Sequence, residues 1–65
     1  MKNLAEGLQK ELTRNRELLQ MYRDIPTGGF GAMMIQNDIT GAEEAIKAGD
    51  VVKMLTAYKK LEASE

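Results

Sequence analysis

The chain has 65 residues, with nine basic and ten acidic side chains, a net charge of −1, and neither cysteine nor histidine. This length supports one domain at most, disulfides are excluded, and a zinc site would have only oxygen ligands, which zinc rarely accepts. The charge balance argues against the basic surface of a nucleic-acid binder, and no apolar run is long enough for a membrane-spanning helix.

The first predicted helix covers residues 4–23. Asn3 precedes it as an N-cap, and Glu6 follows three residues later, as in a capping box. Pro26 closes the segment, because the residue before a proline avoids helical dihedral angles. Apolar side chains recur along one face of this helix at spacings typical of an amphipathic helix: Leu4, Leu8, Leu12, Leu19 and Tyr22.

The second predicted helix covers residues 30–47, after a glycine-rich break at residues 25–31. Thr27 is the candidate N-cap. Gly31 and Gly41 weaken this helix but permit another backbone to approach it closely. The apolar face of the helix comprises Ile35, Ile39, Ala42 and Ile46. The apolar surface is widened at the start of the helix by Phe30, Met33 and Met34.

The third predicted helix covers residues 51–62. Gly49 suits the left-handed position after a helix, and Asp50 is the N-cap of the next one. One face is expected to be apolar and comprises Val51, Met54, Leu55, Tyr58 and Leu61. The other face carries Lys53, Thr56, Lys59 and Lys60. The sequence therefore predicts one all-α domain, a three-helix up-down-up bundle with two long helices and one short helix.

The first helix also fits a seven-residue repeat, whose seam positions are Ala5, Leu12 and Leu19, and Leu8, Asn15 and Tyr22. Such a repeat favours side-by-side packing, and a polar residue within it often sets the register. Two interpretations stay open. In one, two first helices face each other in a homodimer. In the other, the stripe packs on the same chain with Asn15 near an edge, and both arrangements can coexist.

Small chains often gain stability from disulfides, a metal or a partner subunit. Only the partner subunit is open to this chain, so we expect a homo-oligomer, most simply a dimer. The candidate interface residues are Leu8, Leu12, Asn15, Leu19, Tyr22, Phe30, Met33 and Met34.

Catalytic chemistry has few candidate residues here. Without histidine or cysteine, and with Ser64 as the one serine, the usual nucleophile–base pairs are excluded. Glu43 and Glu44 are adjacent on a helix and point about 100° apart, so they share no site. The segment 27–31 lacks the lysine and hydroxyl residue of a phosphate loop, which favours a plain turn. We expect no enzyme, no cofactor and no metal.

Two functions from different classes fit these observations. The leading hypothesis is a non-catalytic interaction or adaptor protein that self-associates, cytoplasmic because the first ten residues lack a secretory signal. The alternative is a small DNA-binding accessory regulator whose third helix reads the major groove. Glu44 and Asp50 sit where that motif usually has apolar groups, which argues against it. The DNA contacts would be Lys53, Thr56, Lys59 and Lys60.

The string from Asp24 to Ala32, followed by Ala48 to Val52, resembles short uncharacterised helical proteins of bacteria and their prophages. This resemblance covers most of the chain, and it implies no site and no activity. The segment from Ala42 to Leu61 is also similar to one helix pair of the tetratricopeptide type. A single pair does not make a solenoid, because three or more repeats are needed.

Overall fold

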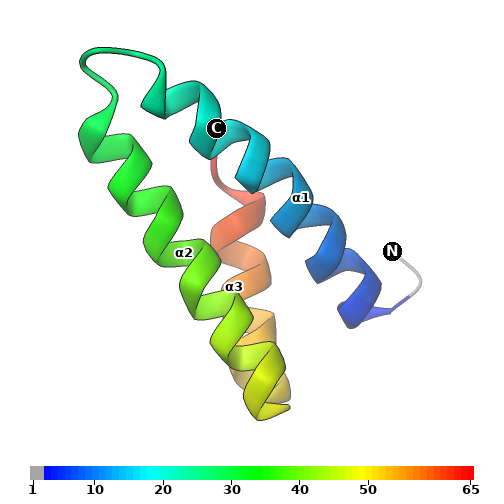
Figure 1. Cartoon of the computed structure of the whole chain (residues 1–65). Coiled ribbons are helices and arrows are strands. Elements are labelled where there is room, and N and C mark those ends of the chain that lie inside the picture. The colour runs from blue at the N-terminus through cyan, green and yellow to red at the C-terminus, as the bar shows by residue number, and fades with distance from the viewer. Residues whose placement is uncertain (1–2) are drawn as a thin grey trace.

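The computed structural model describes residues 3–65, which form three helices in up-down-up order (Figure 1). Helix α1 covers Leu4–Arg23, α2 covers Gly29–Ala48 and α3 covers Val51–Glu62. No strand is present among the described residues. The predicted all-α bundle of two long helices and one short helix is confirmed, and α2 extends one residue beyond the prediction at each end.

All three helices contribute to one core, because each packs against both of the others. In Figure 1, α3 lies behind α1 and α2, and its C-terminal end reaches the middle of α1. Burying one leucine side chain stabilises the fold by about 1.5–3 kcal/mol. The buried apolar residues of this core are Leu8, Leu12, Leu19, Ala32, Ile35, Ile39, Ala42, Ala57 and Leu61.

Side-chain caps begin two of the helices as predicted. Asn3 Oδ1 accepts a hydrogen bond from the Glu6 N–H at 2.8 Å, and Asp50 Oδ1 accepts one from the Lys53 N–H at 3.1 Å. The prediction that Thr27 caps α2 is wrong. The helix begins at Gly29, so the N-cap position falls on Gly28, and Thr27 lies one residue too early.

The connection between α1 and α2 depends on two glycines that lie against Tyr22. A Cβ atom at Gly28 would lie 2.2 Å from the Tyr22 carbonyl oxygen. A Cβ atom at Gly31 would lie 2.8 Å from Cδ1 and Cε1 of the Tyr22 ring. The glycine-rich segment is therefore a turn that lets the two long helices meet closely, in agreement with the interpretation from the sequence.

The predicted inner face of α3 is partly wrong. Val51 is 60% exposed and Leu55 is 46% exposed, whereas Ala57 and Leu61 are buried. A small residue at the contact with α2 lets the helices approach, and Ala57 supplies it. Because the face with Ala57 and Leu61 packs inward, Val51 and Leu55 point toward solvent, while Met54 stays partly buried against the core.

No helix in the described part of the chain combines the length and the apolar character needed to cross a membrane.

Candidate interaction surface

Five of the six seam positions of α1 face the chain's own core, whereas Ala5 is exposed. Leu8, Leu12, Asn15 and Leu19 are buried, and Tyr22 packs partly buried against the same cluster. These five residues are therefore not free for a partner while the bundle is folded. Of the two interpretations of the seam, the structure places the stripe against the other two helices of the same chain.

Asn15 lies in the centre of the bundle, so the prediction that it lies near an edge is wrong. Its Nδ2 donates to the carbonyl oxygens of Glu11 at 2.8 Å and of Leu61 at 3.0 Å. Its Oδ1 is buried and accepts no hydrogen bond from any described residue. Asn15 lies inside because the last turn of α3 ends against α1, and the carbonyl groups of a helix end need donors.

Arg14 supplies the other donors at the end of α3. Its Nη2 lies 2.6 Å from the Leu61 carbonyl oxygen, and its Nη1 lies 2.9 Å from that of Ser64. Glu11 holds the guanidinium by accepting hydrogen bonds from Nε and Nη2 at 3.1 and 2.9 Å. A positive charge suits the C-terminal end of a helix dipole. No sequence motif marks Arg14 for this contact, because its acceptors lie about fifty positions away in the chain.

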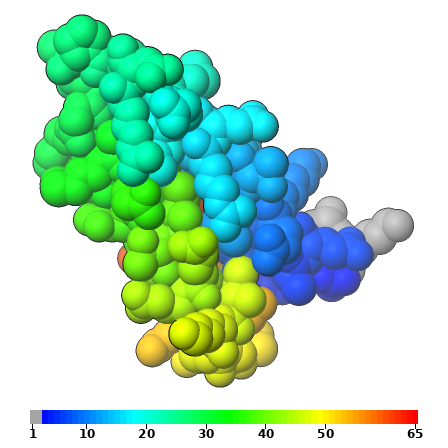
Figure 2. Space-filling view, viewed as in Figure 1, coloured from blue at the N-terminus to red at the C-terminus, as the bar shows by residue number. Residues whose placement is uncertain are grey.

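The start of α2 exposes three large apolar side chains. Phe30 is 73% exposed, Met33 is 53% exposed and Met34 is 51% exposed. These three residues are called the Phe30 patch below. In Figure 2 the first half of α2, coloured green, forms the left edge of the molecule, and no other helix covers it in this view. The Phe30 patch contains three of the candidate interface residues, and these are the ones that stay accessible.

The outer face of α2 carries a second stripe at helical spacing. Four residues separate Phe30 from Met34, three separate Met34 from Asn37, and four separate Asn37 from Gly41. The helix has charges only from Asp38 onward, so residues 29–37 of α2 are uncharged. A surface helix normally has one apolar face and one polar face. The first half of α2 departs from this pattern, because its outward face is also apolar.

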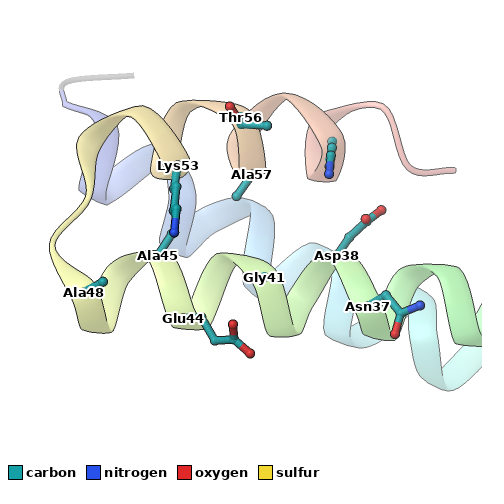
Figure 3. Close-up of a pocket in the computed structure, with 10 residues that line it drawn as sticks. Asn37, Asp38, Gly41, Glu44, Ala45, Ala48, Lys53, Thr56 and Ala57 are labelled. Atoms are coloured by element: carbon teal, nitrogen blue, oxygen red, sulfur yellow. The ribbon is translucent and has the colours of Figure 1, made fainter.

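A groove of about 430 Å³ runs between α2 and α3, beside the outer stripe (Figure 3). Small residues line its interior, namely Gly41, Ala45, Ala48 and Ala57. In Figure 3, Asp38 points from α2 toward α3, and Lys53 points from α3 toward α2. Charged and polar residues complete the lining: Asn37, Asp38, Glu44, Lys53, Thr56 and Lys60.

The candidate DNA contacts lie on the exposed side of α3, and two of the lysines share the groove with acidic residues. Lys53 and Lys60 line the groove together with Asp38 and Glu44. Phosphate contacts need unopposed positive charge, and the nearby carboxylates reduce it. The other two candidates, Thr56 and Lys59, are exposed. The groove is thus less favourable for DNA than the four residues alone suggest.

Tyr58 and Ser64 form side-chain hydrogen bonds near the end of α3. Desolvation and the neighbouring carboxylates of Glu62 and Glu11 raise the pKa of Tyr58. The Tyr58 hydroxyl donates to Glu62 Oε2 at 3.2 Å, and the Ser64 hydroxyl donates to the Lys60 carbonyl oxygen at 3.2 Å. Among residues 3–65, no three acidic side chains gather where they would hold a metal ion.

Comparison with known protein families, with curated proteins and with solved structures finds no match for this chain. Its function therefore has to be inferred from the surface itself. The sequence indicated Phe30, Met33 and Met34 as interface candidates, because large apolar residues widen the apolar surface at the start of α2, and their role at an interface stays a prediction. It did not indicate the groove, because small residues line a groove only where a second helix packs beside them, and the sequence does not show how α2 and α3 pack.

Proposed function

We propose that this chain is a non-catalytic adaptor that binds other proteins through the Phe30 patch. The observation that supports the proposal is the exposure of a phenylalanine and two methionines side by side on one helix. Fully burying a side chain of this kind is worth about 1.5–3 kcal/mol, and the folded chain alone does not gain it. Exposed apolar clusters of this type commonly mark protein interaction sites.

The chemistry of the patch suits a protein partner. Phe30 is a large rigid side chain of the kind that anchors interfaces, while Met33 and Met34 adapt to the shape of a partner. Residues 29–37 are uncharged, so covering them desolvates no charge. A partner with an apolar surface is therefore favoured over a charged ligand such as a phosphate.

Self-association and a cytoplasmic location belong to the same proposal. A chain of this length without cysteine or histidine gains stability most readily from a partner subunit. The seam of α1 packs against the chain's own core except at Ala5, so we assign the contact to the Phe30 patch, whose phenylalanine is as exposed as any large apolar residue described, at 73%.

A DNA-binding accessory role for α3 is the alternative proposal. It is supported by Lys53, Thr56, Lys59 and Lys60, all of which are exposed on that helix. The test is a gel mobility shift of duplex DNA. A shift that weakens steeply with added salt and is lost in K59E/K60E would favour DNA binding. A chain that leaves duplex DNA unshifted at low salt would exclude it.

The adaptor proposal is tested by a photo-crosslinking amino acid placed at position 30 and expressed in the native host. We expect irradiation to join the chain covalently to other proteins. The matched control places the same group at Glu17, an exposed position on α1. Equal yields from positions 30 and 17, or no adduct with a second kind of protein at position 30, would overturn the proposal.

A further inference from the structure

Gly41 is a glycine that the folded chain does not require. It lies inside α2 and is exposed, and a Cβ atom built there would meet no atom within 4 Å. Glycine inside a helix costs about 1 kcal/mol relative to alanine. Gly28 and Gly31 are different, because the contact with Tyr22 leaves no room for a side chain at either position. The open space at Gly41 therefore points to an approach from outside the chain.

The groove beside Gly41 has the size to receive bulky apolar groups, and its lining combines small residues with charged side chains from both helices, namely Asp38, Glu44, Lys53 and Lys60. Its volume of about 430 Å³ lies within the range of roughly 300–1,000 Å³ of pockets that take such groups. Gly41, Ala45 and Ala48 line it from α2, and Ala57 lines it from α3. The same helix exposes bulky groups at its other end, in the Phe30 patch.

We propose that the groove receives the Phe30 patch of a second copy of this chain, in an antiparallel twofold dimer. This deepens the proposed function, because it rests on the Phe30 patch as a docking surface and names one occupant. The spacing of the stripe defines the register. When Phe30 lies opposite Ala48 of the second copy, Asn37 lies opposite Gly41, and each bulky half of α2 meets a small-residue half.

The charges and shapes select the antiparallel arrangement. In a parallel pair of α2 helices, Glu44 would face Glu44 of the second copy, and the bulky ends would meet each other. In the antiparallel pair, Glu44 lies beside the uncharged residues 29–37 of the second copy, near Met34. A twofold axis then forms the same contact twice, as an isologous interface requires.

The available area is that of a weak dimer. The whole chain exposes 4581 Å², and the outer face of α2 together with the groove is only a small part of that area. A standard interface buries about 800 Å² per partner. We therefore expect a dissociation constant in the micromolar range.

Sedimentation equilibrium tests the assembly. The wild-type chain should be dimeric at about 200 μM, and Phe30→Ser and Gly41→Leu should each raise the dissociation constant at least tenfold. Gly41→Leu projects into open space, so an unchanged helical spectrum and an unfolding midpoint no lower than wild type should accompany the loss. The control is Met21→Ser, which removes an exposed apolar side chain outside this face and should leave the dimer unchanged.

Cysteine pairing tests the register, because the chain has no native cysteine. A mixture of Asn37→Cys and Gly41→Cys chains should form disulfide-linked dimers that contain one chain of each kind. Each variant alone should form few, since identical positions are offset along antiparallel helices. Efficient self-linking of each variant would overturn the antiparallel register, and a monomeric wild type or an unaffected Gly41→Leu dimer would overturn the groove.

The failure of this inference differs from the failure of the adaptor proposal. A monomeric chain whose position 30 still crosslinks to other proteins would overturn the dimer and keep the adaptor. A dimer whose position 30 crosslinks only to its own kind would overturn the adaptor and keep the dimer.

Discussion

The connection between α1 and α2 and the connection between α2 and α3 both use glycine, yet for different physical reasons. In the first, Gly28 and Gly31 have ordinary dihedral angles and are needed because Tyr22 lies too close for a side chain. In the second, Gly49 meets no neighbour within 4 Å and is needed for its own backbone, which has φ of +67°. One connection depends on tertiary contact and the other on local conformation.

The second connection is complete in its local hydrogen bonds. The Asp50 N–H donates to the Ala45 carbonyl oxygen at 3.2 Å, the bond typical of a Schellman motif. Asp50 also caps α3. A turn of this kind needs only its own residues, whereas the first connection needs α1 and α2 to be in place. The comparison predicts that the effect of a substitution at Gly31, which meets the Tyr22 ring, changes when Tyr22 is substituted. The effects of substitutions at Gly28, which meets the Tyr22 backbone, and at Gly49 should not change.

The largest effect is expected for Gly28→Ala. The new methyl group would meet the Tyr22 carbonyl oxygen, a backbone atom that cannot move without shifting α1. We expect a loss of about 3 kcal/mol in the free energy of unfolding, measured by urea denaturation. Gly29→Ala is the control, because a Cβ atom there meets nothing within 4 Å. Equal stabilities of the two variants would contradict the close contact.

The next effect is expected for Gly49→Val. A β-branched residue resists positive φ, and we expect the free energy of unfolding to fall by about 2 kcal/mol. Gly49→Asn should lose less, because asparagine tolerates this conformation better. The loss should be the same in a Tyr22→Ala background. An unchanged urea midpoint for Gly49→Val would rule out a left-handed cap.

A smaller effect is expected for Asp50→Ala, which removes the acceptor for the Lys53 N–H. Loss of an N-cap side chain typically costs about 1 kcal/mol. Asp50→Ser retains a capping oxygen and should keep most of the stability in thermal unfolding. If serine and alanine were equally destabilising, the cap would contribute nothing.

The smallest net effect is expected for Gly31→Ala, because two terms oppose each other. Alanine favours the helix by up to about 1 kcal/mol, while its methyl group displaces the Tyr22 ring. In the wild-type background we expect a small loss of stability. In a Tyr22→Ala background the same substitution should stabilise, and a double-mutant cycle measures this coupling. Additive effects would show that the ring does not depend on Gly31.

Local features of the fold were predictable from the sequence. Caps and breakers act within a few residues, so Asn3, Pro26, Gly49 and Asp50 indicated the helix limits almost without error. The regular spacing of leucines in α1 indicated its buried face. The Thr27 prediction failed by one residue, because α2 begins at Gly29 and its N-cap position falls on Gly28, which lies against Tyr22.

Contacts between distant segments were not predictable. Arg14 and Asn15 donate to carbonyl groups at the end of α3 and just beyond it, 46 to 50 positions away, and no local pattern indicates such a pair. The inner face of α3 was misjudged because Ala57, a small residue, determines the contact with α2. The same contrast applies to the candidate site. The residues of the Phe30 patch were candidates from the sequence, whereas the groove, which needs two helices, was not predicted.

The hydrogen bonds from Arg14 and Asn15 to the end of α3 have a consequence for synthesis on the ribosome. α3 has 12 residues, a length at which an isolated helix is marginal in water. Its last carbonyl groups find their donors on α1, which is translated first. While only α1 and α2 have emerged from the ribosome, the carbonyl groups of α3 that accept hydrogen bonds from Arg14 and Asn15 are still absent. The bundle can therefore close only after the residues up to Ser64 have left the exit tunnel.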